Sequence, residues 1–241
     1  NIFTATHYDP IPAGADDSSP LGQFIAAQPS VFNVVREMID RHLDDKPERA
    51  LDVGTNVGGM AYRIADIAET VLGIDTAFNP VLTARRMQCG YPVPQTGFQR
   101  YLDGHRHEVR EVHPVTDNTE YLVASATQLP VAGSFDLITA LNVIDVVPDP
   151  AAFLATLVTR LTTGGHLVIT SPYSWGSDDV PVDKWLGGTD EQTSSQAVIE
   201  SLQALGLEIL EDRDNIPWVL RENQRWYRVF NNHCVIARKR K

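Results

Sequence analysis

The 241-residue chain contains only two cysteines, Cys89 and Cys234, which lie far apart and match no metal-ligand spacing. Such usage argues against a disulfide framework and is typical of a reduced, cytoplasmic protein. No apolar run approaches the roughly 20 residues of a membrane helix, and no signal peptide is visible, so we expect no membrane partner. The length and a hydrophobic fraction of 43% predict one compact domain over residues 1–241.

Positive charge is also scarce. The chain has 20 Lys and Arg against 31 Asp and Glu, a formal net charge of −11. A surface of this sign repels phosphates, which argues against a nucleic-acid partner and favours a small-molecule ligand. The sequence gives no indication of the oligomeric state.

The stretch from Ala50 to Met60 (ALDVGTNVGGM) is typical of a short strand, a glycine turn and the start of a helix. A second strand, Thr70 to Asp75, ends on a carboxylate. In open α/β sheets, a glycine turn after one strand and an acid after the next bind adenosine-containing ligands at the carboxyl ends of the strands. A strand–turn–helix that binds nothing is the alternative.

The glycine spacing discriminates between two kinds of cofactor. A dinucleotide fold requires G-x-G-x-x-G, whereas here three residues separate Gly54 from Gly58 and Asn56 stands between them. Asp52 would repel phosphates but suits a cationic ligand. S-adenosylmethionine carries an ammonium, a sulfonium and ribose hydroxyls, and Asp75 is placed to accept hydrogen bonds from the ribose.

The remaining pattern alternates strands and helices. Further strands are expected at Thr119 to Val123, within Gly133 to Asp145 where the strand enters a polar loop, and at His166 to Ser171, and a helix begins at Pro150. Two last strands are expected at Leu207 to Glu211 and Val229 to Arg238, with a long connection between them. This order resembles the class I S-adenosylmethionine-dependent methyltransferases. The resemblance implies a Rossmann-like α/β fold with a seven-stranded, mostly parallel sheet whose last two strands pair antiparallel. It implies cofactor contacts from Asp52, Gly54, Thr55, Asn56, Gly58, Asp75, Thr76, Ala126, Thr127 and Asn142. Ser125 departs from the acid that the family often has in the adenine loop.

Two segments lie outside the minimal fold. Residues 1–29 are rich in Pro, Gly, Ser and Asp and predict an irregular arm, either mobile or covering the site with His7, Tyr8, Phe24 or Gln28. Residues 91–118 contain Asp103-Gly104 between extended runs, a strong hairpin signal. We prefer a polar hairpin to a metal site at His105, His107 and His113, because no cysteine or carboxylate cluster completes a ligand set. No metal is expected.

A long loop from Ser171 to Gly188 leaves the carboxyl end of a strand, where ligands bind. Its aromatic residues predict either an acceptor pocket or a loop that packs on itself. The sequences SPYSW from Ser171 and KWLGG from Lys184, with NIPWVLRE from Asn215, resemble the C-terminal methyltransferase domain of ovothiol-pathway enzymes. That resemblance implies methylation of an imidazole ring nitrogen of a thiohistidine-type small molecule. Another small-molecule O- or N-methyltransferase and a non-catalytic binding module are the alternatives.

The chemistry suggests roles for individual side chains. An imidazole offers one lone-pair nitrogen and one N–H, so an acceptor on the N–H decides which nitrogen attacks. We expect Tyr173, Asn142 and Asp145 to form this catalytic shell. Substrate contacts are expected from Tyr8, Trp175, Lys184, Trp185, Arg221 and Trp226, with Lys184 or Arg221 holding a carboxylate.

Overall fold

The computed structural model describes residues 2–9, 13–15, 18–91 and 97–240. A seven-stranded sheet forms its centre, with strand order β5-β2-β1-β6-β7-β9-β8. Its strands are β1 (Arg49–Val53), β2 (Thr70–Asp75), β5 (Thr119–Val123), β6 (Phe135–Leu141), β7 (Leu161–Ser171), β8 (Leu207–Asn223) and β9 (Trp226–Lys239). The pairs from β5 to β7 are parallel, whereas β9 runs antiparallel to both β7 and β8. The predicted fold is confirmed.

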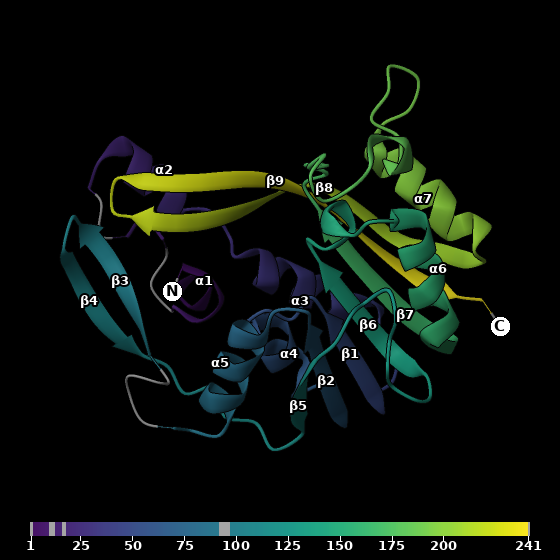
Figure 1. Ribbon diagram of the computed structural model, residues 1–241, viewed down its shortest axis with the longest axis horizontal. Coiled ribbons are helices and arrows are strands. Elements are labelled where there is room, and N and C mark those ends of the chain that lie inside the picture. The colour runs from purple at the N-terminus through teal and green to yellow at the C-terminus, as the bar shows by residue number, and fades with distance from the viewer. Residues whose placement is uncertain (1, 10–12, 16–17, 92–96, 241) are drawn as a thin grey trace.

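Helices cover both faces of the sheet (Figure 1). One face packs on α3 (Val31–His42), α4 (Gly59–Ile64) and α5 (Phe78–Gln88), and the other on α6 (Pro150–Arg160) and α7 (Ser194–Ala204). Successive strand residues alternate between the two cores: Ala50 packs with Met38, and Leu51 packs with Phe153. Strands buried on both faces explain the nearly continuous apolar runs in the sequence.

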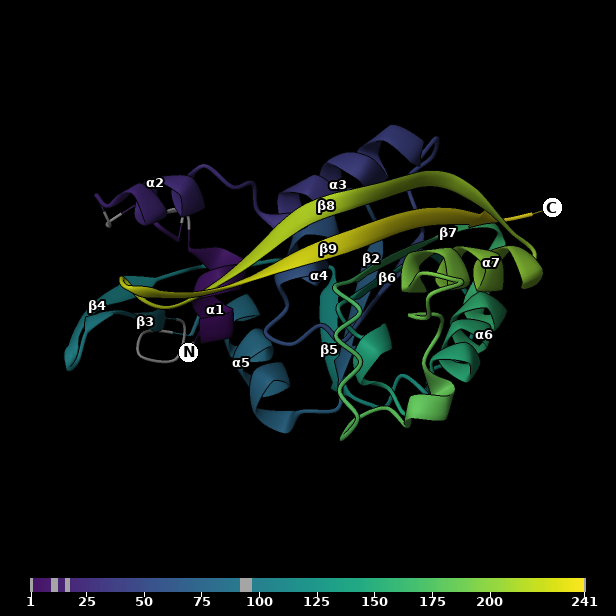
Figure 2. The same ribbon diagram turned by 90° about the horizontal axis from the view of Figure 1, so that it is seen from above.

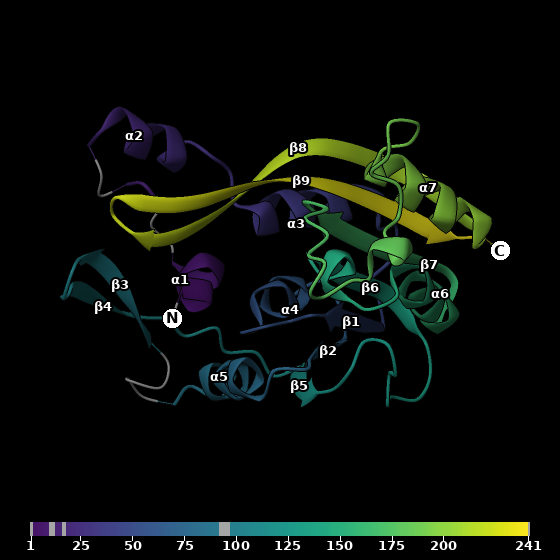
Figure 3. The ribbon, with the colours of Figure 1, turned by 45° about the horizontal axis from the view of Figure 1, so that its top comes forward.

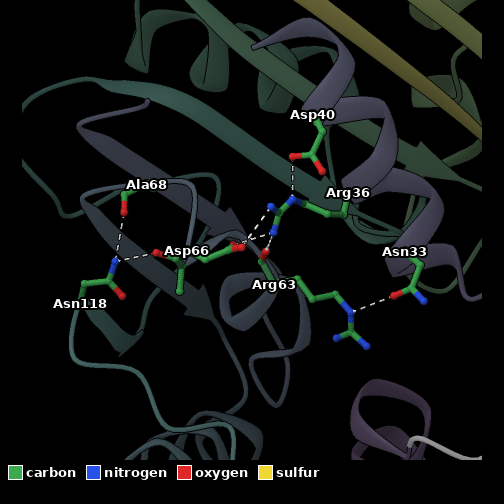
Figure 4. A network of polar contacts seen from close by, with 8 residues as sticks. Asn33, Arg36, Asp40, Arg63, Asp66, Ala68 and Asn118 are labelled. Carbon is green, nitrogen blue, oxygen red and sulfur yellow. Dashed lines mark hydrogen bonds and ion pairs between the residues drawn. The ribbon is translucent and has the colours of Figure 1, made fainter. Parts of the chain in front are cut away.

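A polar network fastens α3 to the segment that follows α4 (Figure 4). Arg36 Nε donates to Asp40 at 2.8 Å, and its guanidinium contacts Asp66 at 2.6 Å and the Arg63 carbonyl oxygen. Asn118 Nδ2 donates to the carbonyl oxygen of Ala68 at 3.1 Å, which ties the start of β5 to the same segment. These bonds fix the C-terminal end of α4, the helix that follows the glycine turn.

The inserted segment forms the expected hairpin. Strands β3 (Gly97–Asp103) and β4 (Arg106–Glu111) pair antiparallel around Gly104, which has a φ of +52°. Residues 92–96, inside the predicted 91–118 insertion, lie outside the described residues. Among the described residues, no group of three or more His, Cys, Asp or Glu side chains is arranged to hold a metal ion.

Two features differ from the sequence prediction. The arm over residues 1–29 is not wholly irregular, because it contains helices α1 (Ile2–Tyr8) and α2 (Pro20–Ala26). A Ser19 side chain that accepts from Gly22 N–H caps α2, and Pro20 occupies its first turn. The second difference is β8, expected over 207–211, which continues to Asn223. As an edge strand it tolerates Pro217 and register shifts that disguise a strand in the sequence.

The extended β8–β9 hairpin contacts both the N-terminal arm and the inserted β3–β4 hairpin. It runs beyond the sheet to the β3–β4 hairpin, and α1 lies beneath it beside α4 (Figures 2 and 3). Helix α1 contacts both β8 and β3, and Gln224 N–H at the hairpin tip donates to the Leu102 carbonyl oxygen at 3.2 Å. Residues of α1, β3 and β8, which are far apart in sequence, line one common cavity. In the described chain no helix is long and apolar enough to cross a membrane.

Candidate active site

A cavity of about 530 Å³ opens at the carboxyl ends of β1, β2, β5 and β6. Strand β1 lies between β2 and β6, so the chain order reverses at this point of the sheet. Parallel α/β sheets bind ligands in the crevice at such a switch point. Of the predicted cofactor residues, those that line the cavity are Asp52, Gly54, Thr55, Asn56, Asp75, Thr76, Ala126, Thr127 and Asn142.

The glycine turn needs its glycines for two different reasons. Gly54 and Gly58 have φ values of +70° and +89°, which disfavour any residue with a Cβ. A Cβ on Gly54 would also lie 2.3 Å from Val143 Cγ2. One on Gly58 would lie 2.5 Å from the Tyr121 hydroxyl. Gly58 does not line the cavity, so its part in the structure is to shape the turn.

Asp52 lies buried at the floor of the cavity, with 2% of its surface exposed. Its Oδ1 accepts from Thr139 Oγ1 at 2.7 Å, and its Oδ2 accepts from Ala61 N–H at 3.1 Å. Burial raises the pKa of Asp52 to about 6, although these hydrogen bonds act in the opposite direction. A cation in the cavity would favour the ionised form.

Asp75 lies at the end of β2 with its carboxylate fixed by backbone groups. Oδ2 accepts from Asn56 N–H and Oδ1 from Ala77 N–H, both at 2.9 Å. A carboxylate oxygen has more than one acceptor site, so each oxygen can also accept from a ligand hydroxyl. The bond from Asn56, which has a left-handed φ of +51°, couples the glycine turn to this acid.

The far end of the cavity is less polar. Ala124 and Ala126 line one side, and Val146, Val147 and Pro148 line the other. Ser125 Oγ and Thr127 Oγ1 lie 2.9 Å apart and hydrogen-bond to each other. The mostly apolar residues of these two loops are suited to contact a flat heterocycle.

Asn142 follows β6 with a φ of +55° and also lines the cavity. Its Oδ1 accepts from Thr170 Oγ1 at 3.0 Å and from Asn232 Nδ2 at 2.8 Å. These two bonds fix the side chain, and a backbone held in a sparsely populated conformation is typical of functional sites.

The charged side chains that line the cavity, among the described residues, are negative. Among the described residues that line it, Asp52 and Asp75 are acidic and none is a lysine or arginine. Phosphate groups find no cationic partner here, whereas an ammonium or sulfonium finds two carboxylates. The residues present therefore fit S-adenosylmethionine and disfavour a dinucleotide.

The loop from Ser171 to Gly188 does not line this cavity. The rings of Tyr173, Trp175 and Trp185 stack in sequence, with centroid separations of 5.9 and 6.5 Å. Trp175 Nε1 donates to Ser194 Oγ at 2.8 Å, and Trp185 Nε1 donates to the Val180 carbonyl oxygen at 3.0 Å. In this structure the aromatic residues of the loop stack on one another and are also bonded to the loop backbone and to α7.

The other predicted loop residues have partners on neighbouring elements. Lys184 is exposed and pairs with Asp149 at 3.0 Å. Asp145 Oδ2 accepts from Ser174 N–H at 2.9 Å and from Ser174 Oγ at 2.7 Å, so it anchors the loop. The Tyr173 hydroxyl lies 2.8 Å from His233 Nδ1, and burial raises its pKa.

A second cavity, of about 630 Å³, lies next to the first and shares Val31, Phe32 and Trp218 with it. The predicted substrate residues Tyr8 and Arg221 line this cavity. Trp226 lines neither cavity; it is 58% exposed at the tip of the β8–β9 hairpin. The structure thus divides the predicted acceptor residues between the second cavity, the loop from Ser171 to Gly188 and the exposed tip of the β8–β9 hairpin.

The sequence pattern did not identify Phe3, Phe32 or Trp218, although all three line the first cavity. Phe32 reads as an ordinary apolar residue at the start of α3, and Trp218 as part of a loop. A strand prediction that continued to residue 223 would have indicated the position of Trp218, because alternating side chains of a strand place Trp218, Leu220 and Glu222 on one face.

The comparisons with known proteins agree with this geometry. The methyltransferase domain family matches residues 28–232, and the chain belongs to this family. The ubiquinone biosynthesis O-methyltransferase of Xanthomonas axonopodis pv. citri is 28% identical over 143 residues, which are 58% of this chain and 50% of that protein. The chain spans about half the length of the curated relatives it matches.

Solved structures share the fold. The N-methyltransferase NodS from Bradyrhizobium japonicum WM9, in complex with S-adenosyl-L-homocysteine, has a TM-score of 0.56 at 15% identity, covering 93% of this chain and 94% of NodS. The [4+2]-cyclase SpnF has a TM-score of 0.58 at 18% identity, covering 88% of this chain and 81% of SpnF. The chain is an S-adenosylmethionine-dependent methyltransferase domain, and S-adenosylmethionine is its cofactor.

Proposed function

We propose that this domain transfers the methyl group of S-adenosylmethionine to an imidazole ring nitrogen of a thiohistidine-type small molecule. The donor supplies a methyl group activated by the sulfonium. The donor is proposed to bind in the first cavity, at the carboxyl ends of β1, β2, β5 and β6, which is called the donor cavity below. The observation that carries the proposal is the absence of a suitable base among the described residues that line this donor cavity. His7, Asp52 and Asp75 are the titratable groups there.

None of these three groups is suited to remove a proton from an acceptor. The pKa of His7 falls to about 3 because it is buried and lies near Arg63, and its Nδ1 already accepts from Gly59 N–H. Both oxygens of Asp52 accept hydrogen bonds within the protein, and the acceptor capacity that Asp75 keeps beside its two backbone bonds is assigned to the ribose hydroxyls. A neutral imidazole attacks through an existing lone pair and loses its proton afterwards, so it needs no base before transfer.

The donor residues are proposed to act by position and charge. Asp75 would accept from the ribose hydroxyls, and Ala126 and Thr127 would flank the adenine. The negative charge of Asp52 would attract the ammonium and sulfonium of the donor, and this attraction is strong because the site is buried and has a low dielectric constant. Aligning the reacting groups and excluding water can contribute about 7–11 kcal/mol to lowering the barrier.

The acceptor is proposed to approach from the second cavity, past Phe32 and Trp218. These aromatic rings line both cavities and are suited to contact a planar acceptor. Trp218 could also face a cation by a cation–π contact. Tyr8 and Arg221, on the walls of the second cavity, would then contact the remainder of the acceptor. Tyr173 and Asp145 would act on the acceptor only after the loop from Ser171 to Gly188 moves.

O-methylation of another small metabolite is the second candidate. Its support is the similarity to curated ubiquinone biosynthesis O-methyltransferases. A hydroxyl acceptor requires a base. His233 would be this base, in a series of hydrogen bonds in which it lies 2.8 Å from the Tyr173 hydroxyl and its Nε2 lies 2.6 Å from Asp212 Oδ1.

A panel experiment separates the two candidates. The protein is incubated with methyl-labelled S-adenosylmethionine and, separately, thiohistidines, histidine, catechols and simple phenols, and labelled products are identified by mass spectrometry. We expect label on a ring nitrogen of a thiohistidine and none on the phenolic acceptors. Label on a hydroxyl, with no imidazole product, would replace the first proposal by the second.

A further inference from the structure

Helix α1 forms a wall between the two cavities. Phe3 and His7, four residues apart on one helical face, line the donor cavity, whereas Ile2, Ala5 and Tyr8 line the second cavity. The helix has only two turns, so its position depends on what anchors it. Its anchors lie on the glycine turn, on α4 and on β3.

The first anchor is His7 itself. Gly59 N–H donates to His7 Nδ1 at 3.1 Å. A Cβ on Gly59 would lie 2.3 Å from that nitrogen, so only glycine allows the ring to approach this closely. The ring also packs against Phe32 with the centroids 4.6 Å apart. Gly59, which follows the turn, therefore allows α1 to pack closely on this segment.

Three further contacts hold the same end of α1. Tyr8 Oη donates to the Val57 carbonyl oxygen at 2.8 Å. Arg63 Nη2 donates to the His7 carbonyl oxygen at 2.8 Å. Asp9 forms a buried ion pair with Arg100 of β3. These contacts fix the C-terminal end of α1 and, with it, the backbone of His7.

This geometry determines the tautomer of His7. Nδ1 accepts a hydrogen bond, so in the neutral ring the proton is on Nε2. Burial keeps the ring neutral, with its pKa lowered to about 3. His7 lines the donor cavity and its Nδ1 is already used, so the Nε2–H is the group that it can offer to a ligand.

The donor cavity has a specific need for such a group. Its lining combines two carboxylates with no lysine or arginine among the described residues, yet the amino-acid part of the donor carries a carboxylate as well as an ammonium. His7 and Asp52 are both bonded to the first turn of α4, through Gly59 N–H and Ala61 N–H. Asp75 and the 124–127 loop line the other part of the cavity.

We propose that His7 is a donor-binding residue: its Nε2–H donates to the carboxylate of the amino-acid part of S-adenosylmethionine, so that α1 covers that part of the bound donor. A neutral N–H binds that carboxylate without adding a positive charge beside the sulfonium. The proposal rests on the donor site described above and concerns binding rather than the identity of the acceptor.

The test compares two ligands that differ only at the amino-acid part. S-adenosylhomocysteine contains it, and 5′-methylthioadenosine does not. Their dissociation constants are measured by calorimetry on the whole chain for the wild type, His7→Asn and His7→Gln. The Asn amide can replace Nδ1 as acceptor from Gly59 N–H but does not reach as far as Nε2, whereas Gln places an N–H near Nε2.

His7→Asn is expected to weaken S-adenosylhomocysteine binding about tenfold or more and to leave 5′-methylthioadenosine within twofold. His7→Gln should recover part of the lost affinity. Tyr8→Phe is the matched control: it removes an anchor of α1 but no group that lines the donor cavity, so it should change the two affinities by the same factor.

Several outcomes would overturn the inference. Equal weakening of both ligands by His7→Asn would show that His7 only positions α1. Unchanged affinities would show that the carboxylate binds elsewhere. Failure of the wild type to bind either ligand would instead refute the donor site itself, which keeps the two claims distinguishable.

Discussion

Replacing Asp75 by alanine tests how the cavity holds the adenosine part of the donor. In the structure both oxygens of Asp75 already accept a backbone N–H, from Asn56 and Ala77 at 2.9 Å each. Their remaining acceptor capacity is directed to the ribose hydroxyls in the proposed complex. The substitution removes a charged acceptor, and a hydrogen bond to a charged group contributes about 1.5–3 kcal/mol. Donor affinity should therefore fall roughly ten- to a hundredfold.

The assay is calorimetric titration of S-adenosylhomocysteine, with thermal unfolding measured in parallel to establish that the variant is folded. Asp190→Ala is the control, because Asp190 is exposed and its removal changes the net charge by the same amount. Asp75→Asn should fall between wild type and Asp75→Ala, since the amide keeps one acceptor oxygen. An unchanged dissociation constant in folded Asp75→Ala would refute the assignment of the ribose to this side chain.

Four further predictions follow from the same contacts. Because burial raises the pKa of Asp52 to about 6, donor affinity should fall as the pH drops below about 6 and the carboxylate is neutralised. Asp52→Asn should abolish this pH dependence, and a wild-type affinity that stays constant from pH 5 to 8 would contradict the prediction. Tyr173→Phe removes the bond to His233 and should lower turnover while donor binding, measured by titration, stays the same. Arg221→Ala should mainly raise the acceptor Michaelis constant in steady-state kinetics; loss of donor binding alone would place Arg221 outside the acceptor site. Phe153→Ala should lower the free energy of unfolding by about 3–5 kcal/mol in urea titrations, since Phe153 is fully buried; a change below about 1 kcal/mol would mean that the core closes around the gap.

The sheet could be predicted from the sequence because local patterns decide it. Strand β2 ends at Asp75 and β5 covers 119–123, as expected, since short apolar runs bounded by turns leave few alternatives. Asp103-Gly104 located the inserted hairpin because the turn needs a residue with positive φ. The glycine turn likewise needs positive φ, at Gly54 and Gly58, and Gly54 lines the proposed donor cavity.

The acceptor side was harder to predict, because it depends on long-range packing. The aromatic residues of the loop from Ser171 to Gly188 suggested a pocket, but their composition is equally compatible with the stacked arrangement that the structure shows. The extension of β8 was hidden by Asn215, which has a φ of +62°, and by Pro217. The position of His7 depends on Gly59, 52 residues away, and no local pattern encodes that contact.

The central claim is that the cavity at the ends of β1, β2, β5 and β6 binds the methyl donor between its two carboxylates. A crystal structure of the protein with S-adenosylhomocysteine tests it most directly. We predict the ribose hydroxyls within hydrogen-bonding distance of Asp75, the adenine between Ala126 and Val147, and the amino-acid part beside Gly54 and His7. Density for the ligand in the second cavity, or a ribose with no contact to Asp75, would contradict the account.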